Sequence, residues 1–487
     1  MQAYHDTDLT QFGSFAELLD FVEKSREEPG SFENFEQELG GRMRALENDL
    51  KAVQLARYDV EAQVVWVDGR EWRRCLEKEP KRYLSASGPV TVARNLFRPS
   101  GGGKSICALD LRAGIVGGLC TPILARQVSY AMGHMTSAET ADLFREFGVE
   151  GPSSSSCDRI PKVVGEAWER NREHWEAALR EQETVPAEAT VMAVSLDGVM
   201  VPDKEAQREA KVAREKKKKD LSQATGGPAG YREVGCGTVS LFDAEGNRLD
   251  TVRYGRAPEY KKKTLTEQLD AEVASILAAR SDLALVALAD GAEENWRYFA
   301  GATWERATKI VDYGHACQHL KAGLVAHYSA SSIEGRAEYE RLKLILKDQH
   351  DGVGEVITEL RRLERSLRQR NRKKAGKLVR KERKYFENQR ERMDYARYQE
   401  LGLPIGSGVV EAACKTLATQ RMKRSGMSWG DGKQPILTIR SLQQSGRWDR
   451  GWRLIANDFQ HTPLVVVNHG GLKSFTQPDY APVAQAA

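Results

Sequence analysis

Two aspartates each follow an apolar run and are each followed by glycine. Asp197 lies in SLDGV after the run TVMAVSL, and Asp290 lies in ALADG after LALVALA. We expect both runs to be buried strands that end at the acid. Two acids at the tips of neighbouring strands would form a Mg²⁺ site, because Mg²⁺ prefers oxygen ligands. The alternative that each Asp simply caps the next turn or helix stays open.

A third acid, Glu411, follows GSGVV and begins EAACKTLATQRMKR, which we expect to be helical. The helix dipole or a pair with Lys415 would also explain a glutamate here, so Glu411 is specific only as part of a set. Phosphodiester cleavage and strand transfer can use two metal ions about 3.5–4 Å apart. We therefore predict that Asp197, Asp290 and Glu411 are catalytic and bind two Mg²⁺ ions, for which Mn²⁺ can substitute.

The elements around these acids indicate a mixed α/β core. GCGTVSLFD and RLDTVRYG flank a turn and predict a hairpin. Residues 262–279 predict a helix, and ATKIVDYGHA a further buried strand that runs into a helix. We place the first part of the core at 186–328 and its final helices at 402–460. The charged insert between Pro202 and Tyr231 is predicted to be a mobile loop that contacts DNA through Lys216 and Lys217.

Residues 329–401 are predicted to be an all-helical insertion. From Arg361 to Arg397 there are 16 Lys or Arg and 5 Asp or Glu, a local balance of 16 − 5 = +11. A solvated surface is the simple explanation, but such an imbalance is typical of attraction to phosphates. The predicted DNA-binding residues here and in the final helices are Arg372, Lys373, Lys374, Lys377, Lys415, Arg421, Lys423 and Arg424.

The N-terminal part is predicted to be mainly helical. In residues 1–80, an apolar series at steps of three and four from Phe32 to Val53 predicts a helix face, either packed in a core or used for self-association. Residues 81–121 are predicted to form a small β-rich element. Residues 122–185 are predicted to be a helix-turn-helix DNA-binding domain, although three packed helices can also just make a core. Residues 461–487 are expected to be a flexible tail.

The overall composition does not define a function class. It is consistent with a cytoplasmic protein that associates with the nucleoid when it is bound to DNA. The net charge is +4 over 487 residues. No apolar run reaches the ~18–20 residues of a membrane helix, and the first residues have no signal-peptide pattern. The seven cysteines are scattered and lack a CxxC pair, so we expect reduced, mostly buried thiols.

Taken in order, several segments resemble the ISKra family of bacterial insertion-sequence transposases, relatives of the Mutator-like group. The resemblance covers roughly residues 85–460 and is carried by SLDGVMVP, YREVGCGTVSLFD, GRAPEYKKKTL, ALADGAEENW, VDYGHACQHL, GLPIGSGVVEAACK and QRMKRSGMSW. It implies an RNase H-like mixed-sheet core, with Asp197, Asp290 and Glu411 as an Asp/Asp/Glu triad. It also implies that Asp312 and His315, within VDYGH, support the active site. The N-terminal cysteine zinc motif common among relatives is missing.

The resemblance implies a multidomain α plus α/β transposase that acts on double-stranded DNA. Its substrates would be the terminal inverted repeats of its own element and a target, and synapsis of two ends requires a homo-oligomer. Two alternatives stay open. One is a structure-specific nuclease on the same fold that does not join strands. The other is a non-catalytic DNA-binding protein derived from a transposase.

Overall fold

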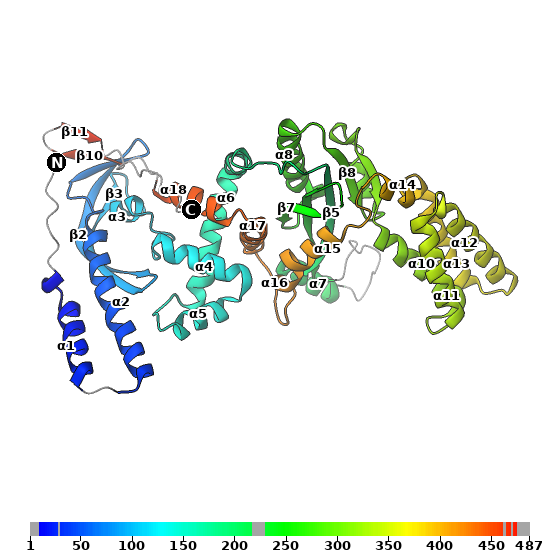
Figure 1. The fold of residues 1–487 in the computed structure, drawn as a ribbon. Helices are drawn as coiled ribbons and strands as arrows, with labels where there is room; N and C mark the ends of the chain where they lie inside the picture. The colour runs from blue at the N-terminus through cyan, green and yellow to red at the C-terminus, as the bar shows by residue number, and fades with distance from the viewer. Residues whose placement is uncertain (1–8, 28–29, 217–228, 461–463, 469–470, 475–487) are drawn as a thin grey trace. The chain divides into compact units, whose positions relative to one another are not determined.

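A computed structural model describes residues 9–27, 30–216, 229–460, 464–468 and 471–474 of the chain (Figure 1). The chain forms two compact units, residues 1–175 with 449–487, and residues 176–448. Within the described ranges, no helix is long and apolar enough to cross a membrane. Six of the seven cysteines are buried and only Cys75 is exposed, which confirms the expected buried thiols.

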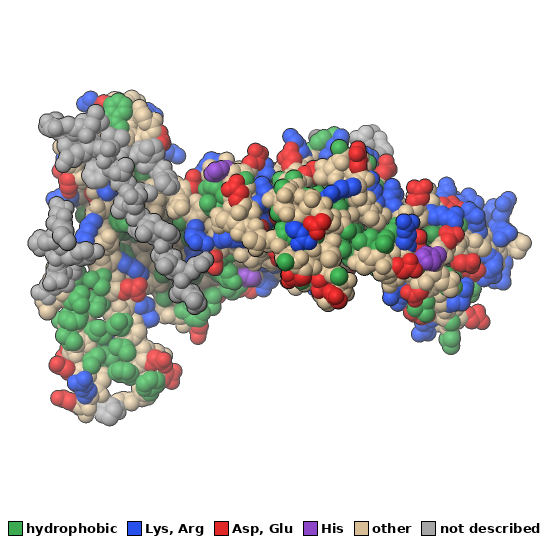
Figure 2. Space-filling view, turned by 45° about the horizontal axis from the view of Figure 1, so that its top comes forward, with side chains coloured by type: hydrophobic (Ala, Val, Ile, Leu, Met, Phe, Trp, Pro, Cys, Tyr) green, Lys and Arg blue, Asp and Glu red, His purple; other side chains and the backbone are tan. Residues whose placement is uncertain are grey.

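The first unit begins with the short turn η1 (Leu9–Gln11) and a helical hairpin of α1 (Gly13–Glu27) and α2 (Phe32–Ala56). The Phe21 ring stacks on Phe35 with centroids 5.5 Å apart. The apolar series predicted for α2 is only partly buried in the structure. Leu46 is buried, whereas Phe32, Met43, Leu50 and Val53 are exposed, and Figure 2 shows hydrophobic side chains on this hairpin.

A six-stranded antiparallel sheet follows, in the order β11-β10-β1-β2-β3-β4. The predicted helical character of residues 1–80 is therefore wrong after Ala56. The Asp68-Gly69 pair has positive φ at both positions, as in a hairpin turn, and joins β1 to β2. The prediction of a flexible tail is wrong for two of its segments, because they pair into this sheet. The strands are β1 (Val64–Val67), β2 (Arg70–Ser85), β3 (Gly88–Pro99), β4 (Ile106–Cys107), β10 (Leu464–Asn468) and β11 (Gly471–Ser474).

The helices expected over residues 122–185 are present. Thr136 begins α5 with a capping box, in which its hydroxyl accepts from the Glu139 amide and the Glu139 carboxylate accepts from the Thr136 amide. Their predicted role as a DNA reader remains a prediction. The helices of this region are α3 (Ala108–Arg112), α4 (Pro122–His134), α5 (Ser137–Glu146) and α6 (Ser154–Glu181), and α18 (Trp448–Gln460) comes much later in the chain.

The second unit contains a five-stranded mixed sheet in the order β7-β6-β5-β8-β9. β5, β6 and β7 form an antiparallel meander, and β8 and β9 extend it in parallel with β5. The predicted mixed α/β architecture and the predicted hairpin are confirmed. The strands are β5 (Val191–Pro202), β6 (Tyr231–Phe242), β7 (Arg248–Arg256), β8 (Ala284–Ala289) and β9 (Thr308–Val311).

Because side chains alternate between the two faces along β6, its residues show which helices cover each face of this sheet. A Cβ at Gly237 would meet Leu269 of α8 (Lys263–Ala279), so that face carries α8. Cys236 points to the other face, where it clusters with Val410 of α15 (Gly408–Ala413) and Leu437 of α17 (Lys433–Gln444). Residues of the central strand β5 are thus covered from both sides.

The helices predicted for residues 329–401 are present and follow α10 (Tyr313–Tyr328). α12 buries the apolar face predicted for it, including Val356, Leu360 and Leu363. Figure 1 shows α12 and α13 side by side. The helices are α11 (Ile333–Asp348), α12 (Gly352–Gln369), α13 (Lys373–Gln389) and α14 (Tyr395–Glu400), with the short turn η4 (Arg390–Arg392). Further short elements of the unit are η2 (Tyr260–Lys262), α9 (Glu293–Tyr298), η3 (Ala302–Trp304), η5 (Cys414–Thr419) and α16 (Gln420–Met422).

The insert after Pro202 is not a loop throughout. Residues Lys204–Lys216 form α7, whose start is capped by the buried Asp203 carboxylate through the Ala206 amide at 2.8 Å. The same carboxylate pairs with Lys433. This cap and this ion pair stabilise α7, a helix that its highly charged sequence did not predict. The Lys216 side chain and the whole of Lys217 lie outside the described residues.

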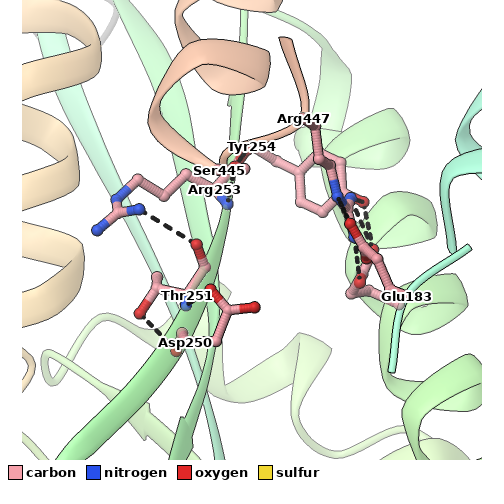
Figure 3. Close-up of polar contacts among 8 residues, drawn as sticks. Glu183, Asp250, Thr251, Arg253, Tyr254, Ser445 and Arg447 are labelled. Carbon is pink, nitrogen blue, oxygen red and sulfur yellow. Dashed lines mark hydrogen bonds and ion pairs between the residues drawn. The ribbon is translucent and has the colours of Figure 1, made fainter. Parts of the chain in front are cut away.

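A buried ionic cluster ties the turn after α17 to the sheet (Figure 3). The Arg447 guanidinium bonds Glu272 at 2.6 Å, the Tyr254 hydroxyl at 3.0 Å and the Glu183 carboxylate. The Arg447 and Glu272 side chains are only 3% and 2% exposed. Because buried charges are tolerated only when paired, this cluster fixes how the turn after α17 seats on β7 and α8.

Candidate active site

Strand register places three aspartates at one level of the sheet. Ser195 pairs with Leu288 in parallel β5 and β8, and two residues further on are Asp197 and Asp290. Ala289 pairs with Val311 in β8 and β9, so the next residue, Asp312, continues the row. Adjacent strands lie about 4.8 Å apart. The three carboxyl-bearing residues therefore neighbour one another across β5, β8 and β9.

Asp197 does not end its strand, contrary to the prediction. β5 continues to Pro202 because it pairs with β6 along its whole length, whereas its parallel pairing with β8 ends at Ser195. Asp197 pairs with Cys236 and so points to the face that carries α15. Its Oδ1 accepts from the Gly198 amide at 2.7 Å, and its Oδ2 accepts from the Cys414 thiol at 3.6 Å. Burial, and then the charge of Asp290, raise the pKa of Asp197.

Asp290 follows β8 directly, as predicted. Its Oδ1 accepts from the Ala292 amide at 3.0 Å and from the Asn295 side chain at 2.9 Å. Asn295 also donates to the Leu196 carbonyl of β5 at 3.3 Å. One buried amide therefore links Asp290 to the strand that carries Asp197.

Asp312 caps α10 and also holds the start of α15. Its Oδ1 accepts from the His315 amide at 2.5 Å, and its Oδ2 accepts from the Ser407 amide. Burial alone would raise the pKa of Asp312, but the hydrogen bonds from His315 and Ser407 lower it below its usual value. Since Ser407 is the residue before α15, this carboxylate positions the helix that carries Glu411.

His315 joins Glu411 to the aspartate row. Its Nδ1 lies 3.1 Å from Asp312 Oδ1 and 3.6 Å from Glu411 Oε1. One ligand atom from each of Asp312, His315 and Glu411 falls within 4.8 Å of the others. The hydrogen bond to Asp312 raises the pKa of His315 to about 9, against burial and with help from the charges of Asp312, Asp290 and Glu411. The site thus concentrates negative charge around one imidazolium.

The residues fit a divalent cation by their donor chemistry. Burial, and to a smaller extent the charge of Asp290, raise the pKa of Asp197, and a bound cation would stabilise its charged form. Both Asp312 oxygens already accept backbone amides, which suits a supporting role better than a ligand role. Asp197, Asp290 and Glu411 carry oxygen donors of the kind that Mg²⁺ prefers. Among the described residues, however, the ligand atoms that gather within 4.8 Å belong to Asp312, His315 and Glu411, and not to the three predicted acids.

The predicted DNA-binding residues fall into two groups. Arg372, Lys373, Lys374 and Lys377 are exposed at the start of α13, and Figure 2 shows Lys and Arg side chains gathered over the helical insertion. Lys415, Lys423 and Arg424, near Glu411 in sequence, are also exposed. Arg421 is different. It is buried at 3% exposure with its guanidinium 4.9 Å from the Trp429 ring centroid, which does not suit a phosphate contact.

Sequence reasoning missed Asn295, Ser407 and Cys414, which hold the acidic residues in place. Cys414 stands three residues after Glu411, one turn along the same continuous helical segment, and this spacing could have pointed to it. Asn295 stands five residues after Asp290, but only tertiary structure shows its second contact to β5. Ser407 acts through its backbone amide, which no residue type reveals.

The similarity of this chain to known proteins is found among solved structures. No family model matches it, and no curated protein matches it. Among solved structures, a chain of the "Drosophila P element transposase strand transfer complex" matches with a TM-score of 0.24 and 9% sequence identity, over 69% of this chain and 81% of that chain. A likeness at that TM-score carries no argument about function. The function is therefore inferred from the geometry of the site and from the sequence motifs.

Proposed function

We propose that this chain is a DNA transposase of the Asp/Asp/Glu type with an RNase H-like core, as its resemblance to the ISKra family implies. The observation that carries the proposal is the arrangement of acids. Asp197 and Asp290 are level on neighbouring strands, and Glu411 lies 3.6 Å from His315, which in turn lies 3.1 Å from Asp312 on the next strand. A three-stranded antiparallel meander extended by two parallel strands also supports an RNase H-like core.

In this proposal, Asp197, Asp290 and Glu411 hold two Mg²⁺ ions, or Mn²⁺ in their place. Bound divalent ions would activate a water or a 3′-hydroxyl and stabilise the leaving oxygen. Asp312 and His315 support the site: Asp312 seats the start of α15, and His315 orients the Glu411 carboxylate. Asn295 and Cys414 fix the two aspartates.

The substrate is double-stranded DNA, namely the terminal inverted repeats of the element and a target. The exposed basic side chains at the start of α13 support a phosphate contact. The three helices from α4 to α6 are proposed to read the repeats, with at least two copies of the chain needed to bring two ends together. The protein would act in the cytoplasm at the nucleoid.

A strand-transfer assay tests the proposal. The full-length protein is incubated with Mg²⁺, target plasmid and the DNA that flanks its own gene, and joined products are expected. Asp197→Ala, Asp290→Ala and Glu411→Ala should each abolish both cutting and joining. Asp282→Ala is the matched control, because Asp282 precedes β8 at the opposite end from Asp290 and pairs with Arg280.

The assay also separates the alternatives. Cut but unjoined DNA that depends on Asp197 would favour the nuclease without strand transfer. DNA binding without any processing, unchanged by Asp197→Ala, would favour the non-catalytic DNA-binding protein and overturn the proposal.

A further inference from the structure

The helical insertion contacts the segment that follows Asp290. A Cβ at Gly291 would lie 2.2 Å from Cε2 of Tyr385 on α13, so only glycine fits beneath this ring. Gln389 of the same helix donates to the Gly291 carbonyl at 3.2 Å. The Arg392 guanidinium lies 4.5 Å from the Trp296 ring centroid. The insertion therefore holds the Asp290 segment through three separate contacts.

The Tyr385 ring has a fixed orientation. It stacks on the His319 ring with centroids 3.6 Å apart and planes 18° apart. His319 is itself held by the buried Glu382, whose Oε2 lies 2.5 Å from His319 Nδ1. The edge contact with Phe386, at 5.6 Å between centroids, restrains the ring further. A side chain restrained in this way can aim its hydroxyl at one place.

The Tyr385 hydroxyl is buried and has no hydrogen-bond partner among the described residues. Leaving a buried donor unpaired costs about 1–3 kcal/mol, so a structure keeps one only where something else offsets that cost. Burial raises the pKa of Tyr385, and the charges of Asp290 and then Asp312 raise it further. The hydroxyl therefore keeps its proton and lies close enough to Asp290 and Asp312 to be affected by their charges.

Asp290 has an oxygen available for such a donor. Its Oδ1 accepts both described hydrogen bonds, from Ala292 and Asn295, and within the described part of the chain its Oδ2 accepts none. A carboxylate that binds a metal is usually oriented by hydrogen bonds from residues around it. Tyr385 is a candidate to supply one, because its ring packs against Gly291, the residue after Asp290, and its hydroxyl has no partner among the described residues.

We propose that Tyr385 is a positioning residue for Asp290, and that its hydroxyl donates a hydrogen bond to the Asp290 carboxylate when a divalent cation is bound. This inference rests on the proposed function, in which Asp290 is a metal ligand. It gives the insertion a role beyond DNA contact, because the seating of α13 sets the position of the Tyr385 ring. Loss of such a supporting hydrogen bond typically weakens metal affinity or activity about 10–100-fold.

Tyr385→Phe tests the inference, since it keeps the stacked ring and removes only the hydroxyl. Mn²⁺ binding to the full-length protein is followed by the electron paramagnetic resonance signal of free Mn²⁺, without DNA. We expect the Mn²⁺ dissociation constant to rise at least about tenfold. The unfolding temperature should not fall, because the variant removes a buried hydroxyl that has no partner among the described residues. Tyr398→Phe is the matched control, because its hydroxyl bonds the Glu391 carbonyl at 3.4 Å and should leave Mn²⁺ binding unchanged.

The outcomes separate this inference from the proposed function. Wild-type Mn²⁺ affinity in Tyr385→Phe, together with weakened binding in Asp290→Asn, would overturn the role of Tyr385 and leave the metal site standing. Wild-type Mn²⁺ affinity in Asp290→Asn would overturn both. An equal loss of affinity in Tyr385→Phe and Tyr398→Phe would also reject a specific role for the Tyr385 hydroxyl.

Discussion

Replacing Arg447 by methionine should strongly destabilise the second unit. The guanidinium is the described cationic partner of Glu272, whose side chain is 2% exposed, and it also pairs with Glu183, which is 27% exposed (Figure 3). Arg447→Met keeps much of the side-chain volume but leaves the Glu272 charge buried. Breaking a buried pair from one side costs about 3–5 kcal/mol. At ~2–4 °C per kcal/mol, the unfolding temperature should fall by about 6–20 °C.

Chemical denaturation at pH 7 measures this destabilisation, and two further variants show where it comes from. Glu183→Gln should cost only about 1–2 kcal/mol, because Glu183 is more exposed than Glu272. The double variant Arg447→Met/Glu272→Gln should be less destabilised than the sum of its single changes, since the unpaired charge is then removed. A cost below about 1 kcal/mol for Arg447→Met would refute the claim that the buried pair governs stability here.

Three further predictions concern α7, the active site and the basic surface. Asp203→Asn should cost about 3 kcal/mol at neutral pH, by urea denaturation, because Lys433 is deprived of its buried partner. Hydrogen bonds from Lys433 and Ala206 lower the pKa of Asp203 although its burial raises it, so the stability that its charge contributes is lost as pH falls. The difference in unfolding free energy between wild type and Asp203→Asn should therefore shrink below pH about 4. A difference that does not change with pH would contradict this. Cys414→Ala should slow DNA cleavage about tenfold while Cys414→Ser, which keeps a donor to Asp197, should not, and equal rates would reject the interaction. Alanine at Arg372, Lys373, Lys374 and Lys377 together should weaken DNA binding and lower the salt slope by about 0.9 for each phosphate that the protein no longer neutralises, whereas Arg380→Ala, whose side chain already pairs with Glu364, should change it little.

The parts of the fold with regular apolar patterns were predictable. The runs before Asp197 and Asp290 are buried strands, and the apolar series of α12 is buried. β2 was not predictable, because none of its residues before Tyr83 is buried, many are charged, and their exposure does not alternate. α7 is equally charged, and its stability comes from a cap and an ion pair with Lys433, which is distant in sequence.

The acids of the site could be named from sequence, but not their mutual arrangement. The strand, Asp and Gly pattern singled out Asp197 and Asp290. Their level position with Asp312 depends on strand register, which only pairing defines. The contacts of Cys414 and Tyr385 join segments far apart in the chain, and no local pattern encodes them.

Anomalous scattering from a crystal soaked in Mn²⁺ tests the proposed metal site most directly. We predict two peaks about 3.5–4 Å apart, bound by Asp197, Asp290 and Glu411. A single ion held by Asp312, His315 and Glu411, whose ligand atoms already lie within 4.8 Å of one another, with Asp197 and Asp290 left without metal, would contradict it.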